Sequence, residues 1–132
     1  MSKPERINVE SLGRLPVFSH ASIAGDLIFV SGTLGTKSGS FELVDGGMGP
    51  ETTQTLENIR AILAGAGASL DDIVKVNVFV TDMSAFPEMN KAYLEFFPGD
   101  PPARITVGCA ALALNAKIEI DCIAAKPSSA RS

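Results

Sequence analysis

The sequence predicts an α+β domain in which one sheet carries two helices on one of its faces. Residues 72–80 alternate in apolar character as a strand does, and residues 50–66 repeat apolar side chains at helical spacing. Further strand-like and helix-like segments are mixed along the chain, which is typical of the α+β class. With 132 residues, the chain is long enough for one domain with a buried core.

The first half of the chain is expected to contain two strands, a loop and a helix. Residues 18–25 and 26–32 resemble strands joined at Gly25 and Asp26, a dipeptide that favours a hairpin. The loop that follows holds at most a brief strand at 41–44. Pro50 suits the first turn of a helix, and Gly65 or Gly67 supplies its left-handed end. The apolar face of this helix consists of Leu56, Ile59, Leu63 and Ala66.

The second half is expected to contain a strand, a helix and two final strands. In residues 72–80 one face is formed by Val74, Val76, Val78 and Val80. Asp82 or Ser84 caps the second helix. Its apolar stripe is formed by Phe86, Met89, Tyr93 and Phe96 or Phe97. Residues 104–112 and 117–125 read as strands with a turn near 113–115, and we expect them to pair as a hairpin if they are neighbours in the sheet.

Composition excludes several classes of function. The net charge of −4, without a basic block, argues against a nucleic-acid partner. No apolar stretch is long enough to span a membrane and the N-terminus lacks a signal-peptide core, so a cytoplasmic protein is expected. Cys109 and Cys122 lie in apolar strand patterns and are interpreted as reduced thiols, and the spacing of His and Cys does not favour a zinc site. We expect a loosely held N-terminal arm at 1–15, one domain at 16–126 and a polar tail at 127–132.

The strand at residues 27–30 carries apolar side chains on both faces. Two helices cannot cover both faces of one sheet, so the other face needs a partner. A monomer has no further element to cover it, and the pattern therefore predicts self-association.

Arg104 is the strongest candidate for a binding residue. It follows Pro101 and Pro102 and begins a strand, although arginine is rarely buried without a partner. If the final two strands pair, Arg104 and Glu119 share the sheet face that looks away from the helices. One interpretation is a salt bridge from Arg104 to Glu119 or Asp121 that only fixes strand pairing. The other is a site in which the guanidinium binds a carboxylate at two points.

Other polar residues give weaker signals. Ser31 ends a strand, where its hydroxyl is either part of a turn or reaches a cleft. His20 lies in an alternating strand, and a lone histidine there is more typical of a surface or core position. No spacing indicates a Ser-His-Asp or Cys-His catalytic arrangement.

Taken together, five segments resemble the Rid family, also called the YjgF or endoribonuclease L-PSP family. They are "SGTLG", "TLENIRAILAGAGASLDDIVKVNVFVTDM", "FPEMNKAYLEFF", "PPARITVG" and "KIEIDCIA". The resemblance covers residues 16–125. It implies a chorismate-mutase-like α+β fold and a homotrimer whose sheets line a central barrel, with the helices outside and ligand clefts between subunits.

The resemblance also implies an activity. Founding members of the family hydrolyse 2-imino acids to 2-oxo acids and ammonia, without a metal or cofactor. Arg104 matches the arginine that binds the substrate carboxylate, Glu119 the acidic residue near the attacking water, and Ser31 the strand-end serine. The partners implied are therefore small 2-imino or 2-oxo acids and further copies of the chain, with neither nucleic acid nor membrane.

The chain departs from the family pattern at the pocket wall. Phe18 replaces a tyrosine, His20 a glutamine and Thr33 another glutamine, while Thr106 stands where many members carry a cysteine. With Arg104 and Ser31, Phe18 and Thr106 are the expected substrate-binding residues, and Arg104 and Glu119 the catalytic ones. The alternative is a protein that binds 2-oxo acids without deaminating them. An endoribonuclease is less favoured because of the negative charge.

Overall fold

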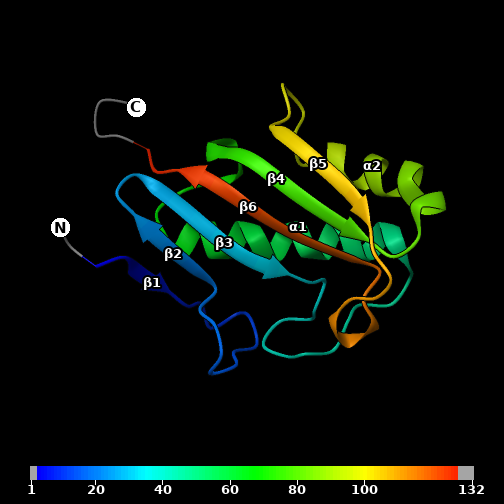
Figure 1. The fold of residues 1–132 in the computed structure, drawn as a ribbon, viewed down its shortest axis with the longest axis horizontal. Helices are drawn as coiled ribbons and strands as arrows, with labels where there is room; N and C mark the ends of the chain where they lie inside the picture. Colours follow the sequence, from blue (N-terminus) through cyan, green and yellow to red (C-terminus); the bar gives the residue numbers. More distant parts are fainter. Residues whose placement is uncertain (1–2, 128–132) are drawn as a thin grey trace.

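The computed structural model describes residues 3–127, which form one six-stranded sheet with both long helices behind it in the view of Figure 1. Most of the predicted tail, from 128 onward, lies outside the described residues. The strands are β1 (Glu5–Ile7), β2 (Ala21–Ala24), β3 (Leu27–Thr33), β4 (Ile73–Val80), β5 (Ala103–Gly108) and β6 (Ile118–Ala125). The helices are α1 (Met48–Gly65) and α2 (Phe86–Leu94), with short 3-10 turns η1 (Leu70–Asp72), η2 (Met83–Ala85) and η3 (Ala113–Asn115).

The strand order in the sheet is β1-β2-β3-β6-β4-β5. Among the strands of this sheet, only β4 and β5 are parallel to each other. This is because α2 returns the chain to the end of the sheet where β4 begins, and β5 starts from there. The expectation that the final two strands pair as a hairpin is wrong, since β4 lies between β5 and β6 and pairs with both. β5 is therefore an edge strand.

The two faces of the sheet differ in what covers them. The helix face is closed: Val76, Val78 and Val80 on β4 are fully buried beneath the helices. Val74 was expected to join them, but it is half exposed. The register of β4 against β6 shifts between Ile73 and Lys75, so that Ile73 is buried instead. The opposite face is open, and it exposes the large apolar side chains of Leu27, Phe29, Ile105 and Val107.

The N-terminal arm, expected to be loosely held, is bound to the sheet. β1 pairs with β2 in antiparallel register, with Arg6 opposite Ser22. Further along, the buried His20 ring accepts a hydrogen bond from the Val9 N–H at Nδ1 and donates to the Gly13 carbonyl through Nε2. A single side chain thus fixes the arm at two points.

Several local predictions are confirmed. Gly25 and Asp26 form the two-residue turn between β2 and β3, with Gly25 at a φ of 60°. α1 ends at Gly65, and the left-handed residue that follows its end is Gly67, whose φ is 81°. The Asp82 carboxylate accepts a hydrogen bond from the Ser84 N–H and caps η2, which leads into α2.

Both cysteines are free thiols, as expected. Burial raises the pKa of the Cys122 thiol to about 12, so it stays protonated and inert at neutral pH. Among residues 3–127, no helix has the length and hydropathy that crossing a membrane requires.

Candidate functional site

The site begins with an irregularity in β3. Val30 pairs with Cys122 and Thr33 pairs with Ile120, so the two residues between them on β3 oppose the single residue Asp121 on β6. This is a β-bulge, a feature that is over-represented beside active sites. The two bulged residues are Ser31 and Gly32. Ser31, expected at a strand end, instead lies within β3, which continues to Thr33.

The bulge forms the floor of a cleft of about 450 Å³. Of the residues singled out in the sequence, Phe18, Ser31 and Glu119 line it, and Arg104 and Thr106 do not. Sequence reasoning missed the remaining side chains of the wall, Leu15, Leu34, Phe41, Ala113 and Leu114. These residues come from three loops, and nothing in a local pattern places loops side by side.

Leu114 is the most unusual of the residues that were missed. Its φ of 58° and that of Asn115, 60°, lie in the left-handed region. Asparagine tolerates this conformation, whereas leucine adopts it only when the surrounding structure enforces it. The turn therefore holds an apolar side chain, about half exposed, against the cleft at a cost in backbone strain.

Glu119 lies directly over Gly32. A Cβ atom at position 32 would sit 1.9 Å from Oε2 of Glu119, so only glycine leaves room for the carboxylate. Burial raises the pKa of the Glu119 carboxyl above its ordinary value, and the neighbouring Asp121 charge raises it further. A half-buried carboxylate of raised pKa beside a cleft has the character of a general base.

Glu119 is held in place through the backbone that precedes it. The buried carboxylate of Glu51, in the first turn of α1, accepts a hydrogen bond of 2.9 Å from the Lys117 N–H. The Lys117 carbonyl in turn accepts one of 3.1 Å from the Thr81 N–H. The start of β6 is thereby fixed to both the helix layer and the end of β4.

Arg104 lies on the other face of the sheet. It pairs in register with the buried Val76, so its side chain points toward α2, where the guanidinium carbon lies 4.7 Å from the Tyr93 ring centre and 5.5 Å from that of Phe86. Such cation–π contacts orient an arginine without consuming its hydrogen-bond donors. Among residues 3–127, Arg104 forms no ion pair with any carboxylate.

Two hydroxyl groups beside Arg104 are also unsatisfied. Thr106 Oγ1 and Tyr93 Oη are both buried and find no hydrogen-bond partner in the described part of the chain. Burial raises the pKa of Tyr93, while the neighbouring Arg104 guanidinium opposes that rise. Buried polar groups without partners are uncommon and point to a function.

The two charged candidates therefore do not meet within one chain. Arg104 and Glu119 were expected on the same open face, but they lie on opposite faces. They are two strands and three residues of register apart, about 14 Å within the sheet. The alternative, a structural salt bridge from Arg104 to Glu119 or Asp121, does not form either. Asp121 instead accepts a hydrogen bond of 2.6 Å from the Asn77 side chain.

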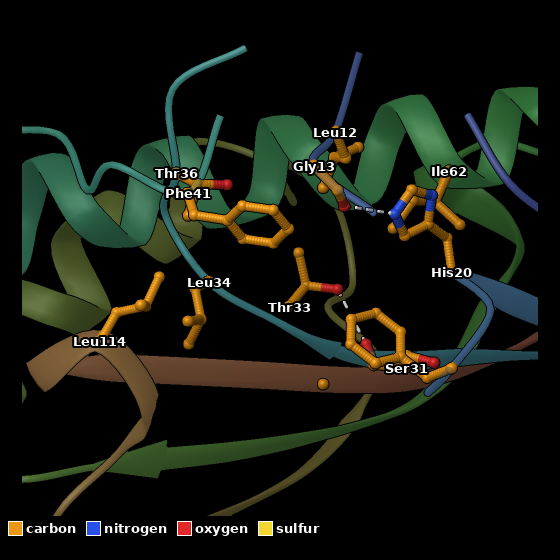
Figure 2. A pocket seen from close by; sticks show the side chains of 12 residues that line it. Leu12, Gly13, His20, Ser31, Thr33, Leu34, Thr36, Phe41, Ile62 and Leu114 are labelled. Carbon is orange, nitrogen blue, oxygen red and sulfur yellow. Dashed lines mark hydrogen bonds between the residues drawn. The ribbon is translucent and has the colours of Figure 1, made fainter. Parts of the chain in front are cut away.

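The smaller candidates have internal partners. The Ser31 hydroxyl donates to the Ser19 carbonyl at 2.6 Å. Thr33 Oγ1 donates to the Ser31 carbonyl at 2.8 Å, as Figure 2 shows. Ser31 therefore faces the cleft as a hydrogen-bond acceptor. His20 is a buried structural histidine, in agreement with one of its two interpretations.

The fold is the chorismate-mutase-like α+β fold, with a concave cleft of the size that small-molecule ligands occupy. The family model described as endoribonuclease L-PSP matches residues 10–126. The chain belongs to this family, which is also called the Rid or YjgF family.

Individual relatives agree with this assignment. The chain is 37% identical over 122 residues to a 2-iminobutanoate/2-iminopropanoate deaminase of Dermatophagoides farinae, covering 91% of this chain and 95% of the relative. The crystal structure of RidA from a Psychrobacter species has a TM-score of 0.87 and 34% identity, covering 92% and 98% of the two chains. Escherichia coli TdcF with bound serine has a TM-score of 0.86 and 28% identity, covering 93% and 99%.

Proposed function

We propose that this protein hydrolyses 2-imino acids to 2-oxo acids and ammonia, in clefts between two copies of the chain. The observation that carries the proposal is the guanidinium of Arg104, which is oriented by aromatic rings and has no carboxylate partner among the described residues. The carboxylate of a small substrate would be the anionic partner that the Arg104 guanidinium lacks. The sequence similarity to a 2-iminobutanoate/2-iminopropanoate deaminase supports the same chemistry.

The proposal requires two copies of the chain, because Arg104 and Glu119 lie too far apart within one chain to act on the same small substrate. Arg104 lies on an edge strand, where a neighbour can approach it, while Glu119 and the cleft belong to the centre of the sheet. The open sheet face exposes Phe29 and Ile105, each about half exposed, and self-association would cover them. We therefore propose a homotrimer in which Arg104 of one subunit faces the cleft of the next, as the family resemblance implies.

The residues would share the reaction as follows. Arg104 holds the carboxylate and orients the imine carbon, and Glu119 of the neighbouring subunit takes a proton from the attacking water. The imine reacts in its protonated form, so the C–O bond forms as the C=N bond becomes single and gives a neutral carbinolamine. Glu119 returns its proton to the amino nitrogen. It then takes the hydroxyl proton as the C=O bond forms and the C–N bond breaks, and that proton leaves with ammonia as ammonium, which regenerates the Glu119 carboxylate. The cycle uses no metal or cofactor.

Subunit complementation tests the proposal. Arg104→Ala and Glu119→Ala should each lower kcat/KM for enzymatically generated iminopropanoate by at least about a hundredfold, the usual range for such groups. When the two inactive variants are mixed and reassembled, each cleft has an even chance of an intact arginine and an even chance of an intact glutamate. About a quarter of the activity should return.

The controls for complementation are each variant reassembled alone, which should stay inactive, and light scattering, which should give a trimer throughout. Recovery would show that the two residues act from different chains. Trimers that form normally but regain no activity would contradict the shared cleft, and an Arg104→Ala protein with undiminished turnover would overturn the function.

A second candidate function is ligand binding without turnover. Phe18 brings no hydroxyl to the cleft, and the related TdcF structure is described with bound serine. This alternative predicts calorimetric binding of 2-oxo acids that depends on Arg104, together with ammonia release no faster than in buffer. An imine-hydrolysis assay on the unmodified protein separates the two functions.

A further inference from the structure

A second, smaller chamber of about 80 Å³ lies behind the cleft. It adjoins the cleft, because the two share the wall residues Phe18, Ser31, Gly32, Leu34, Phe41 and Leu114. Figure 2 shows the chamber between β3, the N-terminal arm and α1, with the Phe41 ring at its side. The volume is several times what one water needs, and it accommodates a short branched alkyl group.

The chamber offers apolar surface and few free polar groups. Leu12 of the arm and Ile62 of α1 line it without reaching the outer cleft. Three of its four polar side chains are already engaged elsewhere: the hydroxyls of Ser31 and Thr33 donate to backbone carbonyls, and both nitrogens of His20 bond the arm. A charged or strongly polar ligand group would find little to replace its hydration there.

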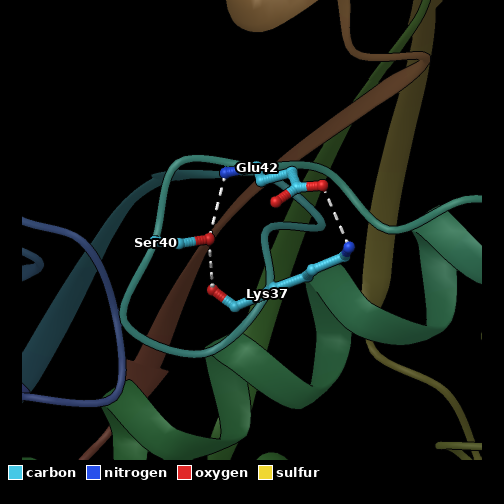
Figure 3. Close-up of polar contacts among 3 residues, drawn as sticks. All are labelled: Lys37, Ser40 and Glu42. Carbon is cyan, nitrogen blue, oxygen red and sulfur yellow. Dashed lines mark hydrogen bonds and ion pairs between the residues drawn. The ribbon is translucent and has the colours of Figure 1, made fainter.

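The walls of the chamber are fixed before any ligand arrives. Phe41 lies in a loop between Lys37 and Glu42, whose side chains form an ion pair of 3.0 Å. The Ser40 hydroxyl also links these two residues, because it donates to the Lys37 carbonyl and accepts from the Glu42 N–H (Figure 3). The Gly39 N–H donates to the Ser11 carbonyl, which ties this loop to the arm. A preformed apolar chamber of this kind costs little to order when it binds.

We propose that this chamber binds the side chain of the substrate and gives the protein a preference for 2-imino acids with branched or longer apolar side chains. The inference rests on the proposed function, since it places the carboxylate at the mouth of the cleft, toward the neighbour's Arg104. The imine carbon then lies near Glu119 and Gly32, and the side chain points inward past Ser31.

Thr36 gives the sharpest test because it lines the chamber and not the outer cleft. Thr36→Met fills the chamber, and Thr36→Val is the matched control that keeps the volume and removes only the hydroxyl. With imines generated from leucine and from alanine as substrates, the unmodified protein should have a kcat/KM for the leucine-derived imine that is higher by at least about tenfold. Thr36→Met should abolish that preference and leave turnover of the alanine-derived imine within twofold, while Thr36→Val should keep the preference.

Binding of the stable 2-oxo acids separates this inference from the proposed function. If no imine is hydrolysed but 4-methyl-2-oxopentanoate binds more tightly than pyruvate, and Thr36→Met alone removes the difference, then the chamber is a side-chain site although the reaction is not the one proposed. Equal affinity for the two acids, or no binding of either, would overturn the inference. So would a preference that survives Thr36→Met.

A measurement without mutation guards against a variant that fails to fold. In the unmodified protein, 4-methyl-2-oxopentanoate should shift the methyl resonances of Leu12, Thr36 and Ile62, whereas pyruvate should shift only those of the outer cleft, such as Leu15. Chamber methyls that do not respond to the branched acid would contradict the proposal.

Discussion

Within residues 3–127, two arginines stack on aromatic rings, and they differ in what else they contact. Arg60 lies 5.1 Å from the ring centre of Phe96 and also pairs with Glu57, one helical turn earlier, at an exposed site. Arg104 stacks on Tyr93 and Phe86, and its potential carboxylate partner, Glu119, lies on the opposite face of the sheet. We interpret Arg60, which already has an anionic partner, as a surface residue, and we propose that Arg104, which has none among the described residues, binds a ligand.

The largest expected effect separates the two arginines directly. Arg104→Ala should abolish imine hydrolysis, a loss of at least about a hundredfold in kcat/KM, because the substrate loses its orienting charge. Arg60→Ala removes the same kind of stacking contact and should leave kcat/KM unchanged. Its cost in stability should be about 1 kcal/mol or less, measured by urea unfolding. Equal losses of activity in the two variants would remove the distinction.

The next effect displaces the carboxylate of Glu119, which lies on the opposite face of the sheet from Arg104. A Cβ at position 32 would overlap Oε2 of Glu119, so Gly32→Ala should push the carboxylate away from the cleft. A displacement of about 1 Å can lower kcat by as much as a hundredfold, and we expect a loss of about ten- to a hundredfold. Gly99→Ala, where a Cβ would meet open space, is the matched control and should be fully active.

A smaller effect comes from giving Arg104 a carboxylate partner within its own chain, as Arg60 already has. Asn90 lies four residues after Phe86 and three before Tyr93, so it shares their side of α2. Asn90→Asp is nearly isosteric and places a carboxylate close to the guanidinium. It should raise KM by about tenfold with a smaller change in kcat, as seen in steady-state kinetics. An unchanged KM would mean that Arg104 does not take part in substrate binding.

The smallest effect concerns pH. Part of the rise in the pKa of Glu119 comes from the Asp121 charge. Asp121→Asn keeps an oxygen to accept from Asn77 and removes the charge, so the pKa of Glu119 should fall. Glu119 then stays ionised at lower pH, and the acid limb of the pH profile of kcat/KM should shift to lower pH. A limb that stays in place or moves up would exclude Glu119 as the base.

Periodicity predicted what lies under the helices. The apolar face at Leu56, Ile59 and Leu63 of α1 and the alternation at Val76, Val78 and Val80 are local patterns, and the core follows them. Ser31 and Glu119, which the family resemblance singled out, both line the cleft, although Ser31 lies within β3 and not at a strand end.

The face of Arg104 was not predictable in the same way. Consecutive strands often pair, and that expectation put Arg104 beside Glu119. The real pairing of β5 depends on α2, which returns the chain to the far side of β4. Leu114, Phe41 and Leu15 reach the cleft from loops whose positions depend on contacts distant in sequence. The strained φ of Leu114 in particular has no signature in its residue type.

The bond between Glu51 and the Lys117 backbone has a consequence for which substitutions the chain tolerates. Because the carboxylate takes up a peptide N–H, the side chain at position 117 is free to vary as far as this contact is concerned. Proline is the exception, because it has no N–H and would leave the buried Glu51 carboxylate without this hydrogen-bond donor. A library of variants at 117 should therefore appear permissive, with proline as its one consistent gap.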